Sequence, residues 1–588
     1  MAHALCVPCR HSLPTQASGA RLEPAESRLR AILPALQFVY TNDLIRATVI
    51  FFAAIGSAFA QDAVDKIFAQ WDSTVSPGCA LSVMQDGHIV YERVYGMANL
   101  DHDIPIRPDT VFHVASISKQ FTAAAILLLA QEHKLSLDDD VRKYIKELPD
   151  FGAQITIRHL IYHTSGLRDQ WELLGLAGWR YSLDLITDDD VLESMSRQKD
   201  LNFKPGEKHV YCNTGYTLLA QIVKRVSGQS LREFTADRIF KPLGMNHTHF
   251  RDDHAEIVKH IAYGYVEGEG GHGYRLSVTN FDTVGATSLL TTVEDLAQWD
   301  ENFYHPRVGG PEMVEQQLQR GKLNDGKELD YAFGLVHGKY RGLRTIGHGG
   351  ADAGYRADLL RFPEQHFSVA CLCNKGEINP GELTKKVADI YLAGKFKDDP
   401  AQVREEPSAK PVSVPVERLA QYAGLYWKKD DEQARRILLK DGKLFWAYSV
   451  DDRVELTALS ENRFQLAAYP VVFTFDAQRL SMQMPDEEKP DVFERVTEVK
   501  PTPAQLAAYA GAYVSEEIEP VYRIVVENGG LVLRRLKSKP QKLEPTLEDY
   551  FEGMNGDIHF QRDAAGKITG FVLNSGRIKN FRFRKAQM

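Results

Sequence analysis

A serine and a lysine stand one helical turn apart in the first third of the chain. Ser116 and Lys119 come directly before residues 121–130, which are apolar almost throughout. Residues at i and i+3 of a helix share one face, and a helix that is apolar all round is buried. Burial lowers the pKa of a lysine, so that it can take a proton from a neighbouring hydroxyl. The spacing predicts a serine nucleophile activated by a neutral lysine, although the same spacing also occurs by chance in many long proteins.

Two further clusters of polar residues precede apolar runs. One residue separates Tyr211 from Asn213, so in an extended segment both side chains point to the same side. Farther along, His348 precedes Gly349 and Gly350 ahead of strand-like runs. Paired glycines at such a place let a ligand lie close to the backbone. Each cluster could contribute to a site, but each alone is a weak signal.

Taken in this order, Ser-x-x-Lys, Tyr-x-Asn and His-Gly-Gly resemble the three signatures of the serine β-lactamase and penicillin-binding protein superfamily. The sequence is similar to the branch that contains class C β-lactamases, D-Ala-D-Ala carboxypeptidases, D-aminopeptidases and related esterases. The resemblance covers residues from about 65 to about 390. It implies an α/β catalytic domain of the β-lactamase/transpeptidase-like kind, in which helices flank an antiparallel sheet and a helical subdomain is added.

The resemblance also implies a role for each matching residue. Ser116 corresponds to the nucleophile that is acylated. Lys119 and Tyr211 correspond to the proton-shuttling pair, and the division of labour between them stays open. Asn213 corresponds to the amide that hydrogen-bonds the lysine and the substrate. No metal and no organic cofactor are implied.

The strand after the third signature is implied to bind substrate. The backbone N–H groups of Ser116 and Ala351 would form the oxyanion hole, with Gly349 and Gly350 beside it. His348 stands where many relatives carry the lysine of Lys-Thr-Gly. Histidine there removes a fixed positive charge that would meet a substrate carboxylate. This departure weakens the β-lactamase interpretation and leaves a carboxypeptidase open.

The elements that must position these residues form the front part of a 588-residue chain, long enough for several domains. We expect the hydrolase domain at residues 61–395 and a charged, proline-rich linker at 396–415. Two β modules are expected at residues 416–498 and 502–588. Residues 1–60 are interpreted as a doubtful leader plus a signal peptide.

An internal repeat supports the two β modules. Residues 419–426 match residues 506–513 at six of eight places, and the offset of 87 residues continues over about 60 residues. Each copy consists of short alternating runs broken by Asp-Gly or Asn-Gly turns, which indicate hairpins. We therefore expect two small antiparallel, lipocalin-like modules without chemistry of their own. We further expect at least one of them to pack near the rim of the Ser116 cleft, the competing view being a remote adaptor.

The segment before the hydrolase domain has the layout of a secretory signal. Uncharged residues follow Arg46 and end in Ala58-Phe59-Ala60, with small residues at the −3 and −1 positions. We expect a signal peptide at about 44–60, cleavage after Ala60, and a periplasmic or secreted protein. An N-terminal anchor or a buried helix is the alternative. The residues in front of it are expected not to belong to the natural protein.

Charge and cysteine content narrow the function further. With 70 basic and 79 acidic residues the net charge is −9, which disfavours nucleic acid as a partner. No cysteine spacing suggests zinc. Cys371 and Cys373 lie on one face of a strand-like run and are expected to be buried thiols. His163, in a His-Thr-Ser-Gly loop, is expected to be structural.

The sequence therefore predicts an exported serine hydrolase that forms an acyl-enzyme with a small-molecule or peptide substrate. Peptides or amides with D-residues, or small esters, are the expected substrates. The alternatives are a true class C-like β-lactamase and a non-catalytic binding or scaffold protein that kept the fold. The second is disfavoured because Ser116, Lys119, Tyr211 and His348 are all intact. No membrane span is expected after signal cleavage, and the oligomeric state stays open.

Overall fold

The computed structural model describes most of the chain from residue 60 onward. The chain separates into two compact units, Met1–Asp65 and Lys66–Met588, and the fold described below is that of the second. The predicted signal segment and its leader, with Cys6 and Cys9, lie outside the described residues, apart from Ala60. The described ranges are 60–181, 183–397, 412–430, 432–447, 453–466, 469–484, 489–554 and 556–587.

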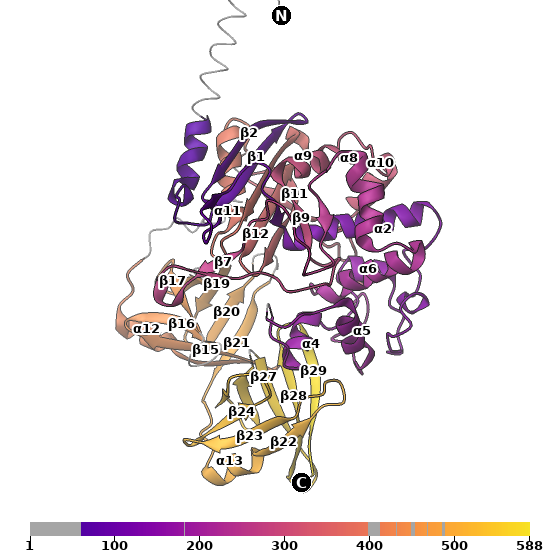
Figure 1. The fold of residues 1–588 in the computed structure, drawn as a ribbon. Coiled ribbons are helices and arrows are strands. Elements are labelled where there is room, and N and C mark those ends of the chain that lie inside the picture. Colours follow the sequence, from indigo (N-terminus) through magenta and orange to yellow (C-terminus); the bar gives the residue numbers. More distant parts are fainter. Residues whose placement is uncertain are drawn as a thin grey trace, which may run out of the picture. The chain divides into compact units, whose positions relative to one another are not determined.

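A six-stranded antiparallel sheet forms the centre of the catalytic region (Figure 1). In spatial order the strands are β10 (Val336–Tyr340), β11 (Leu343–Asp352), β12 (Tyr355–Phe362), β13 (Phe367–Cys373), β1 (Cys79–Gln85) and β2 (His88–Tyr95). Strand β13 is buried along its whole length, as expected for a continuous run of small and apolar residues. Helix α11 (Pro380–Tyr391) packs against β12 and β13, and α9 (Val293–Glu301) packs against β1 and β13.

The predicted buried helix is present and lies at the heart of a helical subdomain. A short 3-10 turn, η2 (Ala115–Ile117), leads into α2 (Ser118–Gln131), and twelve residues of α2 are buried. It packs against α6 (Asn213–Ser227), α7 (Leu231–Thr235) and α10 (Gly310–Gln317). The same region also contains α3 (Ile157–Ile161), α4 (Gln170–Leu176), α5 (Asp188–Ser196) and α8 (Lys241–Leu243).

The tail forms two closed antiparallel barrels of eight strands each, which confirms the two predicted β modules. The first follows helix α12 (Val416–Tyr422), and the second follows α13 (Pro503–Tyr509). The first barrel contains β14 (Gly424–Lys428), β15 (Gln433–Lys440), β16 (Lys443–Ala447), β17 (Arg453–Ala458), β18 (Arg463–Leu466), β19 (Tyr469–Phe475), β20 (Arg479–Gln483) and β21 (Asp491–Val496). The second contains β22 (Gly511–Val514), β23 (Tyr522–Glu527), β24 (Gly530–Arg534), β25 (Gln541–Pro545), β26 (Tyr550–Gly553), β27 (Gly556–Arg562), β28 (Ile568–Ser575) and β29 (Ile578–Lys585).

The repeat seen in the sequence is also a repeat of hydrogen bonds. The buried Tyr426 hydroxyl donates to the Tyr422 carbonyl oxygen at 2.9 Å, and Tyr513 donates to Tyr509 at 2.6 Å. Both bonds tie the first strand of a barrel to the helix before it, 87 residues apart in the chain. The repeat therefore keeps the same link between each barrel and the helix before it.

The two barrels differ in how they are attached to the rest of the chain. The buried apolar side chains of the second barrel, such as Ile518 and Tyr522, belong to one cluster with those of α2, α4 and α5. The buried side chains of the first barrel form a separate cluster of their own. The second barrel is thus part of the same hydrophobic core as the helices that surround Ser116.

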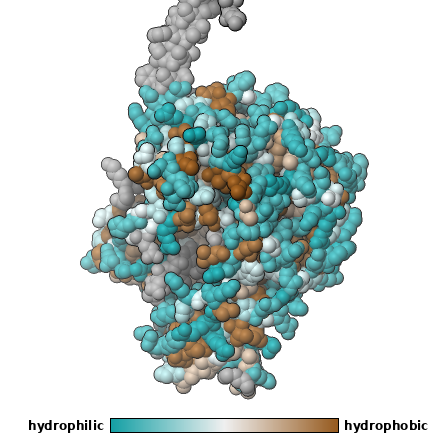
Figure 2. All heavy atoms as spheres, viewed as in Figure 1, coloured by the Kyte–Doolittle hydropathy of each residue, from teal (hydrophilic) through white to brown (hydrophobic). Residues whose placement is uncertain are grey.

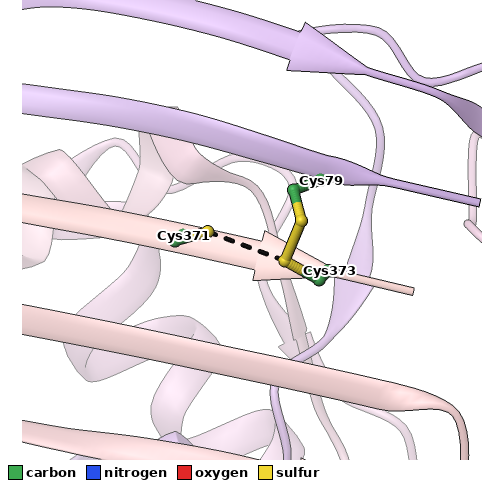
Figure 3. A group of neighbouring side chains, drawn as sticks. All are labelled: Cys79, Cys371 and Cys373. Carbon is green, nitrogen blue, oxygen red and sulfur yellow. Dashed lines mark hydrogen bonds between the residues drawn. A yellow bond between two sulfur atoms is a disulfide. The ribbon is translucent and has the colours of Figure 1, made fainter. Parts of the chain in front are cut away.

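The expectation of two thiols in β13 is wrong for Cys373 and holds for Cys371. Cys373 forms a disulfide with Cys79, which lies directly opposite it where β1 pairs with β13 (Figure 3). Cys371 is free and buried, and its sulfur lies 3.6 Å from that of Cys373. The sequence separation of the bonded pair is 294 residues, so only the strand pairing brings the two sulfurs together.

The face of the molecule in Figure 2 is mostly hydrophilic, with apolar side chains in small separate patches. Exposed apolar residues include Tyr181, Leu183 and Leu276. Among the described residues, the structure has no helix with the length and apolar character needed to cross a bilayer.

Loss of the disulfide should destabilise the catalytic region. Replacing Cys79 and Cys373 by serine should lower the free energy of unfolding by about 2–5 kcal/mol, because the bond closes a very long loop of the unfolded chain. Denaturant titration measures this, and Cys371→Ala is the matched control with a smaller loss. A chain that starts at residue 61 has four cysteines. Alkylation under denaturing conditions should modify two of them without reductant and all four after reduction; four without reductant would contradict the disulfide.

Candidate active site

The structure brings Ser116 and Lys119 together as the spacing predicts. Ser116 is half-buried in the turn η2, whereas the residues on either side of it are buried. The Lys119 amine is fully buried and lies 3.1 Å from the Ser116 hydroxyl oxygen. It also donates to Asn213 Oδ1 at 3.0 Å and to the Ala286 carbonyl oxygen at 2.7 Å. A neutral amine has two N–H groups and one lone pair, so with both N–H groups used in this way the lone pair faces Ser116.

Burial makes the neutral form of this amine accessible near neutral pH. The low-dielectric surroundings lower the pKa of Lys119 to about 7. The Asp169 carboxylate opposes this shift, and the Arg577 guanidinium reinforces it. The rings of Tyr211 and Tyr216 complete the enclosure, with centroids 4.8 and 5.6 Å from the amine nitrogen.

Tyr211 is held beside the pair by a histidine. Its ring packs 4.2 Å from the ring of His163, whose Nδ1 accepts the backbone N–H of Cys212 at 3.1 Å. The Tyr211 hydroxyl is buried, and among the described residues no partner meets normal hydrogen-bond geometry with it. Burial raises the pKa of Tyr211, and the Ser116 hydroxyl partly offsets that rise. The structural role expected for His163 is therefore the positioning of Tyr211.

Asn213 begins helix α6 and is oriented by a carboxylate that the sequence analysis missed. Both the backbone N–H and the side-chain Nδ2 of Asn213 donate to Asp169 Oδ2, at 2.7 and 2.9 Å. The other oxygen, Oδ1, accepts the backbone N–H of Trp171 and so caps helix α4. With its Nδ2 occupied, Asn213 must turn Oδ1 toward Lys119. In the sequence, Asp169 looks like an ordinary N-cap, and no local signal marks its second contact.

His348 lies on β11 and is neutral at physiological pH. Burial, reinforced by the Lys119 charge, lowers its pKa to about 4. Its Nδ1 lies 2.6 Å from the Gly349 carbonyl oxygen and therefore carries the proton, while Nε2 accepts the Tyr331 hydroxyl at 3.2 Å. The site thus has no fixed positive charge at position 348, as the sequence indicates.

Of the paired glycines, Gly350 has a structural need that the sequence did not reveal. A Cβ atom there would lie 2.2 Å from the Val114 carbonyl oxygen, in the turn that carries Ser116. At Gly349 a Cβ atom would meet neighbours only at an ordinary 3.7 Å. The absence of a side chain at Gly350 therefore lets β11 approach the serine turn. Strand β10 pairs with β11 only as far as Gly347, so it does not extend along Gly349, Gly350 and Ala351.

A turn of the second barrel also reaches this region, which confirms that one module packs near Ser116. Arg577, between β28 and β29, donates through one terminal nitrogen to Asp169 Oδ2 at 3.1 Å and to the Tyr211 carbonyl oxygen at 3.4 Å. Its Nε donates to Glu172 on α4 at 3.2 Å. No local pattern in the sequence marks Arg577, because its partners lie about 400 residues away.

An antiparallel sheet between helices, with a serine and a buried lysine at the start of the central helix, defines a class of serine hydrolases that work through an acyl-enzyme. The family model described as Beta-lactamase matches residues 63–392, and the chain belongs to this family.

Relatives support the same assignment. The chain is 31% identical over 406 residues to penicillin-binding protein 4* of Bacillus subtilis, covering 66% of this chain and 88% of that protein. It is 24% identical over 532 residues to a D-aminopeptidase of Brucella anthropi, covering 87% of this chain and 96% of that one. The solved octameric penicillin-binding protein homologue from Pyrococcus abyssi superposes with a TM-score of 0.52 at 25% identity, over 74% of this chain and 99% of that one. The chain is a serine hydrolase of this family, and nothing in these likenesses favours a non-catalytic scaffold.

The glycine contact can be tested with a matched pair of variants. Gly350→Ala should lower the rate of Ser116 acylation about a hundredfold, because the added methyl displaces the serine turn from β11 and small misplacements are costly. Gly349→Ala, with ordinary contacts, should keep most of the activity. Labelling of Ser116 by a fluorophosphonate, followed over time, measures both. Equal losses in the two variants would contradict the proposed contact.

Proposed function

We propose that this protein is an exported serine peptidase or amidase that acts on peptides or amides with a D-residue at the acyl position and forms an acyl-enzyme on Ser116. The observation that carries the proposal is the buried Lys119 amine, 3.1 Å from Ser116 Oγ, with a pKa near 7. The D-residue is supported by the D-aminopeptidase of Brucella anthropi, whose likeness extends over 87% of the chain.

In the proposed reaction Lys119 takes the hydroxyl proton as Ser116 Oγ attacks the substrate carbonyl carbon. The oxyanion accepts hydrogen bonds from the backbone N–H groups of Ser116 and Ala351. Stabilisation of this kind is worth several kcal/mol. The C–N bond then breaks, and the leaving amine takes the proton that Lys119 had accepted, delivered through the Tyr211 hydroxyl. Water then attacks the ester carbonyl carbon and gives up a proton, through the Tyr211 hydroxyl, to Lys119. The ester C–O bond breaks, Ser116 Oγ takes that proton back from Lys119, and the acyl group leaves as a carboxylic acid.

The neutral His348 favours this substrate class over two others. A carboxypeptidase or a β-lactamase must hold a substrate carboxylate, and a fixed cation beside the strand would serve that purpose. Here burial keeps the imidazole uncharged, with a pKa near 4. Gly349, Gly350 and Ala351 would instead hold the substrate through backbone groups of β11.

We further propose export and the domain boundaries. A signal peptide at about 44–60 with cleavage after Ala60 would deliver the chain to the periplasm or the medium, and the Cys79–Cys373 disulfide is typical of such oxidising compartments. The proposed units are the hydrolase domain at 61–395, the linker at 396–415, and the modules at 416–498 and 502–588.

The assignment of the nucleophile and its partners can be tested by labelling and mutation. A fluorophosphonate should modify Ser116, as read by peptide mass spectrometry, and Ser116→Ala should be inactive on D-alanine p-nitroanilide. Lys119→Ala and Tyr211→Phe should each lower kcat about 10²–10⁴-fold. Their double variant should lose far less than the product of the single losses, because the two act as one relay. An adduct on another residue would overturn the assignment, and hydrolysis of a cephalosporin in place of the anilide would favour the β-lactamase.

The acid limb of the pH profile should report Lys119. Below the pKa of about 7 the amine is protonated and cannot accept the serine proton, so kcat/KM should fall about tenfold per pH unit. Above it, kcat/KM should level off. His348, with a pKa near 4, contributes nothing in this window. Lys119→Arg, which stays charged, should be inactive at every pH. A wild-type profile that is flat between pH 5 and 8 would contradict a lysine base.

A further inference from the structure

The second barrel reaches the candidate active site through a single tight turn. Gly576 and Arg577 join β28 to β29, next to helix α4 (Figure 1). Gly576 has a φ of 48°, and a Cβ atom there would lie 2.7 Å from a carboxylate oxygen of Glu172. The turn therefore rests directly on α4, and its glycine leaves room for the adjacent arginine to reach inward.

Polar contacts from Asn202 and Arg168 hold this turn in place. The side chain of Asn202 donates to the Arg577 carbonyl oxygen at 2.8 Å and accepts the Lys579 N–H at 2.8 Å. Arg168, whose side chain is fully buried, donates to the Lys579 carbonyl oxygen at 3.1 Å and forms an ion pair with Glu517 of the second barrel. A buried arginine that has lost one partner is costly, so these contacts define one position for the turn.

The same barrel also holds the other end of α4. Arg535 donates to the Gly175 carbonyl oxygen at 2.6 Å, and the Tyr522 hydroxyl donates to the Leu176 carbonyl oxygen at 2.6 Å. A helix of seven residues is too short to be stable by itself. The carbonyl groups at its end and the carboxylate at its start are thus both held by the second barrel.

From Arg577 a continuous series of contacts leads to the nucleophile. Arg577 donates to Asp169 Oδ2 at 3.1 Å, and the same oxygen accepts both donors of Asn213. Asn213 in turn accepts from Lys119, which lies against Ser116. At the 87-residue offset of the repeat, the first barrel has Pro490 where the second has Arg577. The arginine therefore belongs to the barrel that shares its core with the catalytic region.

We propose that Arg577 is a positioning residue for the acylation of Ser116, which makes the second barrel a part of the catalytic site rather than an adaptor. Its guanidinium neutralises Asp169 and holds that carboxylate on Asn213, so that the Lys119 amine stays oriented and unprotonated. This inference rests on the proposed function, because it assigns a task to Lys119.

The charges around Lys119 determine the sign of the expected effect. Asp169 and Asp352 favour its protonated form, whereas Arg577 disfavours it. The Cys212 thiol, whose pKa burial raises to about 12, is uncharged at pH 7. The nearby His163 and His348 both have lowered pKa values and are neutral at pH 7, and the pKa values of the Tyr211 and Tyr216 phenols are raised by burial. Loss of Arg577 leaves Asp169 uncompensated in a buried place, so Lys119 should keep its proton to a higher pH.

The test compares Arg577→Gln and Arg577→Lys with wild type in the full chain. Arg577→Gln should move the acid limb of kcat/KM for D-alanine p-nitroanilide upward by about one pH unit, a roughly tenfold loss at pH 6 that disappears above pH 9. The loss should be in kcat rather than in KM. Arg577→Lys should restore most of the profile. Arg582→Gln, an exposed neighbour on β29 that faces Asp200, is the matched control and should leave the profile unchanged.

A second variant distinguishes an effect of charge on Lys119 from a loss of folded structure. In the double variant Asp169→Asn with Arg577→Gln, the carboxylate that raises the pKa of Lys119 is gone, so the acid limb should return toward its wild-type position. Thermal denaturation of each variant identifies the folded ones, and if Arg577→Gln does not fold, Arg577→Lys and the double variant decide. An activity loss that is equal at all pH values would overturn the inference and leave a purely structural role.

The outcome also separates this inference from the proposed function. Fluorophosphonate labelling of Ser116 in wild type does not depend on the peptide substrate. If wild type is not labelled at Ser116, the proposed function fails and the inference fails with it. If wild type is labelled and shows an acid limb near pH 7 that Arg577→Gln leaves in place, only the role of Arg577 is overturned.

Discussion

The contact between the buried Lys119 amine and the Ser116 hydroxyl is the interaction on which the rest of the site depends. An amine enclosed by α2, α6 and aromatic rings cannot keep its charge cheaply, so the hydrophobic core that stabilises the subdomain also prepares the base. Asn213 and Ala286 then take both N–H groups and leave the lone pair for the serine. Burial of the Lys119 amine is therefore the common cause of the tight packing around it and of its ability to act as a base.

The same enclosure accounts for the character of the neighbouring strand. His348 loses its charge for the reason that Lys119 does, and the positive charge of Lys119 at low pH adds to the effect. At Gly350 strand β11 comes close to the serine turn, so backbone and not a charged side chain makes this contact. Under the proposed function, selection among peptide or amide substrates would rest on hydrogen bonds and shape rather than on a charge pair with His348.

The two barrels show how copies of one repeat come to differ. Both keep the same tyrosine hydrogen bond to the preceding helix, which maintains the barrel. Among the residues that the structure describes, only the second merges its core with the catalytic region and places an arginine on Asp169. A β module without a nucleophile can therefore still affect catalysis, because the carboxylate it holds lies two hydrogen bonds from the lysine.

Local periodicity determined what the sequence by itself could show. Ser116 and Lys119 are neighbours because the helix repeat places i and i+3 on one face, and the 87-residue repeat with its turn residues was sufficient to predict two β modules. Only the tertiary structure decided the roles of Asp169 and Arg577 and the pairing of Cys79 with Cys373. An aspartate before a helix, an arginine in a hairpin and a cysteine in a strand each look ordinary locally. Their partners lie about 40, 400 and 300 residues away, and strand pairing and core packing, which no short pattern encodes, bring them together.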